Sequence, residues 1–229
     1  MNRNYFTDFL RLFFPSYCYG CRGPMIRFED MLCSSCLRQM PWKFLGNQDE
    51  NQSRLVLGPP FAHTFSLLDF QKGGVAQRLL HELKYNHHPE IGQRLGRMLG
   101  MRMVRKGFRG KFDLILPVPL HVSRYHSRGF NQSAVIAEGI SEMLGASVDA
   151  TIAIRKTPTG TQTKKDKHSR WHNVKDAFTI VYPDRVLDKQ ILLVDDVITT
   201  GATIAAFGDR VFRHGPTSVS VASIADVSR

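Results

Sequence analysis

The sequence lacks several signals that would place it in a common class. No stretch approaches the about eighteen consecutive apolar residues of a membrane-spanning helix. The apolar N-terminus is interrupted by Arg3, Asp8 and Arg11, which is atypical of an export signal. Neither G-x-x-x-x-G-K-[ST] nor G-x-G-x-x-G occurs, so the fingerprints of nucleoside triphosphatases and of dinucleotide-binding domains are missing. We expect a cytoplasmic protein without a membrane span, beginning with a short amphipathic helix.

Cysteine is scarce, and all four cysteines lie near the N-terminus. Cys18, Cys21, Cys33 and Cys36 form two C-x2-C pairs separated by eleven residues. Two such knuckles complete a closed tetrahedral site of the kind that holds structural Zn²⁺. Two disulfides are not expected without an export signal. A thioredoxin-like redox pair is not expected either, because there are two C-x2-C pairs and no βαβ pattern surrounds them. Residues 1–45 are too few to bury a core, so zinc would supply folding free energy on the order of 10 kcal/mol.

Acidic residues are also few. The chain has 20 Asp and Glu against 31 Lys and Arg, a formal charge of +11, which favours anionic partners. Much of the excess lies in Arg78, Lys84, Arg94, Arg97, Arg102, Arg105, Lys106, Arg109 and Lys111. This stretch could bind phosphates or nucleic acid, or it could be an ordinary solvated helix surface. Charge does not choose between them.

Composition predicts two units. Residues 46–60 are polar and end in Gly58-Pro59-Pro60, as a linker does. We therefore expect a four-cysteine module at 1–45, a linker at 46–60 and an α/β domain at 61–229. In that domain, strands are predicted at 61–70, 113–120, 147–155, 176–182, 190–196 and 217–225, helices at 72–85, 88–107, 131–144 and 202–214, and a loop at 121–128. This alternation predicts a mostly parallel sheet flanked by helices, with right-handed crossovers.

One segment carries most of the chemistry. After the apolar run 190–194 the chain reads Asp195-Asp196-Val197-Ile198-Thr199-Thr200-Gly201-Ala202-Thr203 and then enters a helix. A helix N-terminus preceded by hydroxyl residues and glycine offers N–H groups to a phosphate dianion. Two adjacent carboxylates would repel a phosphate but suit the vicinal hydroxyls of a sugar. The combination indicates a phosphorylated ribose. A plain helix cap would explain the threonines but not the acid pair.

This segment resembles the signature of type I phosphoribosyltransferases, and the whole chain is similar to the ComF family, which joins a four-cysteine zinc module to such a domain. Besides 191–203, the resemblance rests on LKY at 83–85, PVPL at 117–120, RGFNQ at 128–132, Gln162, Arg170 with Asn173, and Asp176-Ala177-Phe178. It implies a type I phosphoribosyltransferase fold, a Rossmann-like, mostly parallel sheet flanked by helices. It also implies 5-phosphoribosyl-1-pyrophosphate (PRPP), with Mg²⁺ on its pyrophosphate, as the donor.

The resemblance also implies residue roles. Asp195 and Asp196 would hold the ribose hydroxyls. The 5′-phosphate would contact Val197, Thr199, Thr200, Gly201, Ala202 and Thr203, with Lys84 as a further donor contact. Arg124 and Arg128 would face the pyrophosphate; His121 and His126 could join them or be ordinary surface histidines. Residues 160–172 would be a mobile loop offering Lys164, Lys165, Lys167 and Arg170. For stabilising an oxocarbenium-like transition state we expect Asp195, Asp196, Arg128 and Lys165.

Two functions follow from these expectations. The first is transfer of ribose 5-phosphate to an unknown acceptor with loss of pyrophosphate. The second, implied by the link of the family to DNA uptake in natural transformation, is single-stranded DNA binding with a regulatory or vestigial PRPP site. Its partners would be single-stranded DNA and the uptake machinery, contacted by Lys164, Lys167, Arg170 and Trp171, because an aromatic ring in a basic stretch can stack on a base. Trp171 could instead pack against the sheet.

Overall fold

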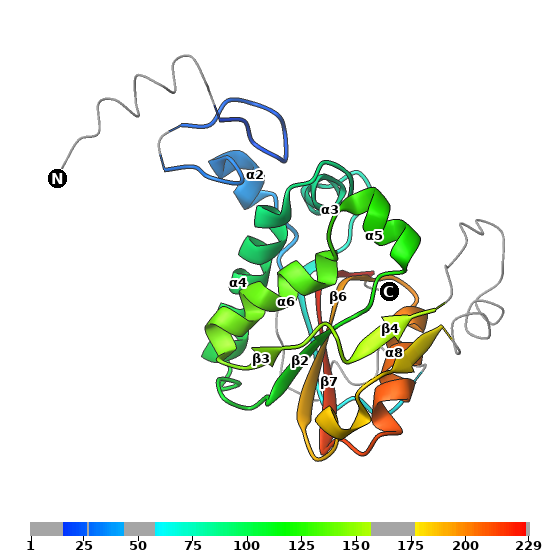
Figure 1. Ribbon diagram of the computed structural model, residues 1–229. Helices are drawn as coiled ribbons and strands as arrows, with labels where there is room; N and C mark the ends of the chain where they lie inside the picture. The colour runs from blue at the N-terminus through cyan, green and yellow to red at the C-terminus, as the bar shows by residue number, and fades with distance from the viewer. Residues whose placement is uncertain (1–15, 27, 44–57, 157–176, 228–229) are drawn as a thin grey trace, which may run out of the picture.

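The apolar runs of the domain form a five-stranded parallel sheet in the order β1-β7-β6-β2-β3, seen in a computed structural model that describes residues 16–26, 28–43, 58–156 and 177–227 (Figure 1). The strands are β1 (Thr64–Asp69), β2 (Leu114–Pro117), β3 (Ser147–Val148), β6 (Gln190–Ile198) and β7 (Ser218–Asp226). The first part of β6 is continuously buried because a parallel strand is covered on both faces. The predicted parallel α/β sheet is confirmed.

Helices cover both faces of this sheet. One face packs against α3 (Val75–Tyr85), α4 (Pro89–Arg105) and α6 (Gln132–Leu144), and the other packs against α8 (Ala202–Phe212) (Figure 1). Ile91, Leu95, Leu99 and Met103 recur every four residues along α4 and form its buried stripe. Helices α4 and α6 touch through their backbones: a Cβ added at Gly139 would lie 2.1 Å from the carbonyl oxygen of Gln93.

Two predictions about individual elements were wrong. Residues 121–128, expected as a loop, hold helix α5 (Val122–Arg128), capped by His121 and by the left-handed Gly129 at φ 75°. The single strand expected at 147–155 is β3 and, after a break, β4 (Ala153–Arg155), which pairs antiparallel with β5 (Phe178–Ile180) outside the main sheet. Strand β6, predicted at 190–196, continues to Ile198 and contains the acid pair as predicted.

The cysteine-containing segment packs directly onto the domain. It includes the short helix α2 (Ser34–Arg38), and its buried Met31, Leu32 and Met40 share one hydrophobic core with α3 and α4. At its end, the N–H of Lys43 donates to the carbonyl of Leu67 (3.0 Å) and the N–H of Asp69 to that of Pro41 (2.9 Å), which extends the sheet beyond β1. Of the expected linker at 46–60, only residues 58–60 are among those described.

Much of the basic stretch is committed to intramolecular contacts. Arg94 pairs with Asp30, Arg97 with Glu142 and Lys84 with Asp196. Arg102 donates to the carbonyl of Lys43 (2.8 Å) and lies over the ring of Trp42. These residues stabilise the packing of helices and module, so the structure favours the plainer interpretation of that charge. No helix among the described residues combines the length and apolar character needed to span a bilayer.

Candidate functional site

The acid pair occupies the carboxyl end of β6, beside α3 and α6. The hydroxyl of Ser133, on α6, donates to Oδ1 of Asp195 (3.1 Å), and the N–H of Asp196 donates to the same oxygen (2.9 Å). Nζ of Lys84, in the last turn of α3, lies 2.8 Å from Oδ2 of Asp196. The structure thus brings together three of the residues predicted for the donor site, although Lys84 is far from the acids in sequence.

The two carboxylates have unequal electrostatic environments. Burial first, and then the neighbouring charge of Asp196, raise the pKa of Asp195 to about 7, while Lys84 and Ser133 act in the opposite direction. Asp196 has the ammonium group of Lys84 against it. Asp195 is therefore the acid whose charge is costly in the ligand-free protein, and hydroxyl donors placed against it would stabilise that charge.

The turn after β6 has the features of an anion site. Gly201 adopts a left-handed conformation (φ 76°), which glycine does without strain, and it caps α8. The N–H of Ala202 lies 3.4 Å from Oγ1 of Thr200, and the helix begins with the N–H of Ala205 donating to the carbonyl of Gly201. The first N–H groups of any helix lack intrahelical acceptors and form the positive end of the helix dipole. A phosphate group fits this position.

Helix α5 presents the predicted arginines. The guanidinium of Arg128 lies over the ring of Tyr85, 5.5 Å from its centroid, and donates to Oε1 of Gln132 (2.8 Å). His121 caps the helix, with its Nδ1 accepting from the N–H of Ser123 (3.2 Å). Lys164, Lys165, Lys167, Arg170 and Trp171 lie outside the described residues.

Arg155 was not among the site residues predicted from the sequence. It ends β4, and its guanidinium lies 5.0 Å from the ring centroid of Phe178. Burial and then the positive charge of Arg124 lower the pKa of Arg155, and the carboxylate of Asp195 opposes them. Arg124, Arg155 and Asp195 therefore lie within electrostatic range of one another. The available signal was an arginine ending the apolar run 152–154, immediately before the basic segment.

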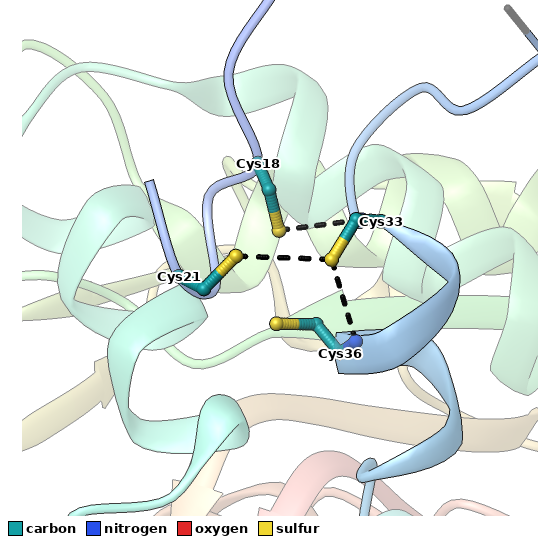
Figure 2. Close-up of side chains that lie close together, drawn as sticks. All are labelled: Cys18, Cys21, Cys33 and Cys36. Atoms are coloured by element: carbon teal, nitrogen blue, oxygen red, sulfur yellow. Dashed lines mark hydrogen bonds between the residues drawn. The ribbon is translucent and has the colours of Figure 1, made fainter. Parts of the chain in front are cut away.

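The four cysteines converge as their spacing predicts. Their Sγ atoms all lie within 4.8 Å of one another, on the two knuckles drawn in Figure 2. The cysteines are free, and the Sγ atoms of Cys21 and Cys33 are 3.7 Å apart, well beyond the about 2 Å of a disulfide bond. Gly20 gives the first knuckle room, because a Cβ there would lie 2.9 Å from Sγ of Cys36. These residues could hold a metal ion.

Backbone N–H groups favour thiolates within this cluster. Those of Gly20 and Cys33 donate to Sγ of Cys18 (3.3 and 3.2 Å), and that of Cys36 to Sγ of Cys33 (3.5 Å). Burial raises the pKa of Cys18, but backbone donors from Cys33, Cys21 and Gly20 outweigh burial and bring that pKa down to about 7. Since the thiolate is the metal-binding form, these donors prepare Cys18 for a divalent cation, whereas burial and then the neighbouring cysteines raise the pKa of Cys36.

Comparisons with known proteins agree with this architecture. The phosphoribosyl transferase domain family matches residues 130–229. The DNA utilization protein YhgH of Shigella flexneri is 30% identical over 220 residues, covering 90% of this chain and 95% of that protein. Competence protein F of Haemophilus influenzae is 26% identical over 235 residues, covering 93% and 98%.

Among solved structures, a glutamine phosphoribosylpyrophosphate amidotransferase from B. subtilis is 21% identical, with a TM-score of 0.42; the match covers 62% of this chain but only 30% of that one. The relatives, in contrast, align over nearly their whole length. The chain therefore belongs to the family of phosphoribosyl transferase domain proteins that includes YhgH and competence protein F, which is the ComF family that its motifs predict.

Proposed function

We propose that this protein binds PRPP with Mg²⁺ at the carboxyl end of β6 and transfers its ribose 5-phosphate to an acceptor, releasing pyrophosphate. The observation that carries the proposal is the sequence of groups along one strand and turn. The carboxylates of Asp195 and Asp196 are followed, within a few residues, by the glycine-capped start of α8. Acceptors for a diol and donors for a phosphate in this order match a phosphorylated ribose.

Each group has a chemical task in this proposal. Asp195 and Asp196 accept hydrogen bonds from the ribose hydroxyls, and residues 199–203 hold the 5′-phosphate. Arg124, Arg128 and Arg155 face the pyrophosphate, and Lys165, which is outside the described residues, would be a further contact. As the glycosidic bond breaks, negative charge grows on the leaving group, and fixed guanidinium groups stabilise it. Bound Mg²⁺ would supply further neutralisation of the pyrophosphate.

We assign Zn²⁺ to the cysteine cluster. Four thiolates within 4.8 Å of one another could fill all four positions around one ion, which suits a structural site rather than a catalytic one. Its role is to hold the residue 18–36 segment in a fold that so short a segment could not maintain alone. Because that segment shares a core with α3 and α4, the metal would stabilise the domain as well.

The second candidate function is handling of single-stranded DNA. The names of the relatives, a DNA utilization protein and a competence protein, support it. The ion pairs of Arg94 and Arg97 weaken it, because they remove part of the basic surface that would bind phosphates. The two functions are compatible: single-stranded DNA would reach residues such as Lys164, Lys167, Arg170 and Trp171, while PRPP occupies the strand end.

Calorimetry on the zinc-loaded full chain tests the proposal. We expect PRPP with Mg²⁺ to bind at one site per chain. A coupled assay, run with and without single-stranded DNA, should then detect the release of pyrophosphate. Binding without release would favour a ligand-gated DNA-binding protein. DNA binding itself should weaken steeply with added salt, since phosphate contacts release counterions. If PRPP does not bind, the donor site is wrong.

Arg155→Met is expected to weaken PRPP binding by about 10- to 100-fold, because it removes one charge-assisted contact to the pyrophosphate. Methionine retains an apolar stem against Phe178. Ribose 5-phosphate, which has no pyrophosphate, should bind the variant and the wild type about equally. Competition calorimetry measures both ligands. Arg213→Met, at the far end of α8, is the matched control; equal losses for both ligands would contradict the assignment.

A further inference from the structure

Helix α3 contacts both the donor site and the first cysteine knuckle, here residues 18–22, which is called the knuckle below. Its last turn holds Glu82, Lys84 and Tyr85 within four residues. Glu82 faces the knuckle, whereas Lys84 and Tyr85 face residues of the site. A single rigid element therefore links the proposed metal to the proposed ligand.

The contact with the knuckle joins a buried carboxylate to an arginine that is itself more than half exposed. Arg22, the residue after Cys21, pairs with Glu82, whose side chain is only 7% exposed. The second oxygen of Glu82 accepts from Nδ2 of Asn86 (2.7 Å), and Arg78 donates to the carbonyl of Gly20. A carboxylate this buried depends strongly on its partner. Arg22 itself has a positive φ of 62°, so the backbone conformation of the knuckle determines the direction in which its side chain leaves the chain.

The contacts with the site leave the same turn. Nζ of Lys84 is 2.8 Å from Oδ2 of Asp196, and the ring of Tyr85 lies beneath the guanidinium of Arg128. Lys84 is two residues from Glu82, and a helix turn moves as a unit because its backbone hydrogen bonds fix it. A displacement of Glu82 therefore moves the partners of Asp196 and Arg128.

We infer that Arg22 and Glu82 are positioning residues of the donor site, through which the metal-bound knuckle holds Lys84 against Asp196 and Tyr85 against Arg128. The inference rests on the proposed function. By linkage, the metal and the phosphoribosyl donor each raise the affinity of the protein for the other, and by the same factor.

The test compares two contacts between knuckle segment and domain. Arg22→Ala removes the ion pair with Glu82 of α3, and Arg94→Ala removes the ion pair of Asp30 with α4, which carries no residue of the site. In zinc-loaded protein, we expect Arg22→Ala to weaken PRPP–Mg²⁺ binding about tenfold or more, within the usual range of coupling. Arg94→Ala should leave the affinity unchanged, and Arg22→Lys should recover most of the loss. Zinc content, measured for each variant, should stay at one ion per chain.

Zinc release gives the reciprocal readout. Saturating PRPP–Mg²⁺ should raise the affinity of the wild type for zinc by the same factor, and so hinder the loss of zinc to a competing chelator. In Arg22→Ala the effect should be much smaller. Unchanged donor affinity in a zinc-loaded Arg22→Ala protein would overturn the inference, and so would an equal loss in Arg94→Ala. If Arg22→Ala does not fold, Glu82→Gln takes its place, because it keeps the shape of the side chain and an acceptor for Asn86.

Failure of the proposed function would look different. If the wild type does not bind PRPP, the donor site is refuted. Amide hydrogen exchange of the ligand-free proteins then tests whether Arg22 and Glu82 still position the end of β6. Faster exchange at residues 82–86 and 195–200 in Arg22→Ala, but not in Arg94→Ala, would support it. Equal exchange in all three proteins would overturn it.

Discussion

Asp195→Asn should weaken PRPP binding by at least about 100-fold and yet stabilise the folded protein at pH 8. The loss of binding follows because a carboxylate accepts two charge-assisted hydrogen bonds from a diol, each contributing about 1.5–3 kcal/mol, and a neutral amide cannot replace them. Calorimetry with PRPP–Mg²⁺ measures this loss. The gain in stability has a separate cause.

The sign of the stability change follows from the raised pKa of Asp195, about 7 in the folded protein against about 3.9 in an unfolded chain. The folded state therefore favours the protonated acid. The stability that this acid contributes is complete below about pH 4 and is lost as the pH rises through 7. Asparagine cannot ionise, so at pH 8 the variant avoids that loss, by about 1–3 kcal/mol after allowing for partial solvent screening.

Urea unfolding at pH 5 and pH 8 tests the stability change, and Asp149→Asn is its control. Hydrogen bonds from Thr151 and Arg185 outweigh burial and lower the pKa of Asp149, so its carboxylate stabilises the fold at pH 8 and its removal should destabilise. If Asp195→Asn lost PRPP binding but was also less stable than the wild type at both pH values, the loss of binding would reflect damage to the fold. That result would contradict the proposed contact with the ribose.

Cys36→Ser should release zinc and lower the free energy of unfolding by several kcal/mol, a large part of the about 5–15 kcal/mol typical of a domain. Cys36 is 2% exposed and belongs to the core that includes Leu79 and Leu83 of α3. The damage should therefore reach the domain as well as the knuckles.

Thermal unfolding with and without a chelator, together with zinc analysis, measures this effect. Ser35→Ala is the matched control, since its side chain is an exposed neighbour on the same short helix. We expect the chelator to reproduce the effect of Cys36→Ser in the wild type and to add nothing in the variant. A Cys36→Ser protein that kept its zinc or its melting temperature would refute the assignment of the metal.

The parts of the fold that the sequence predicted are those encoded locally. Residues 191–194 form an uninterrupted apolar run, and the acids, threonines and glycine that follow lie within one strand and one turn. Cysteine spacing similarly predicted the cluster. Helix α5 was not predicted because it buries no side chain and therefore has no apolar periodicity. Only its caps, His121 and Gly129, indicate it in the sequence.

What the sequence could not supply is the set of partners distant along the chain. Lys84 meets Asp196 and Arg22 meets Glu82 only because α3 is packed between the knuckle and the sheet. Arg155 approaches Asp195 because β4 leaves the main sheet to pair with β5. The sequence left the role of the basic stretch open for the same reason, since Asp30 and Glu142, the partners of Arg94 and Arg97, lie on other elements.

The short pairing of residues 41–43 with β1 has a consequence for solubility. Strand β1 ends the sheet on that side, and an open strand edge is a template for pairing with another chain. The backbone bonds of Pro41 and Lys43 cover this edge, and Lys43, buried between Asp69 and Asp226, anchors the cover. At the opposite side, β3 is only two residues long and offers little to pair with. The cysteine segment thus covers an edge that would otherwise be open to pairing, and we expect metal-depleted protein to aggregate through β1.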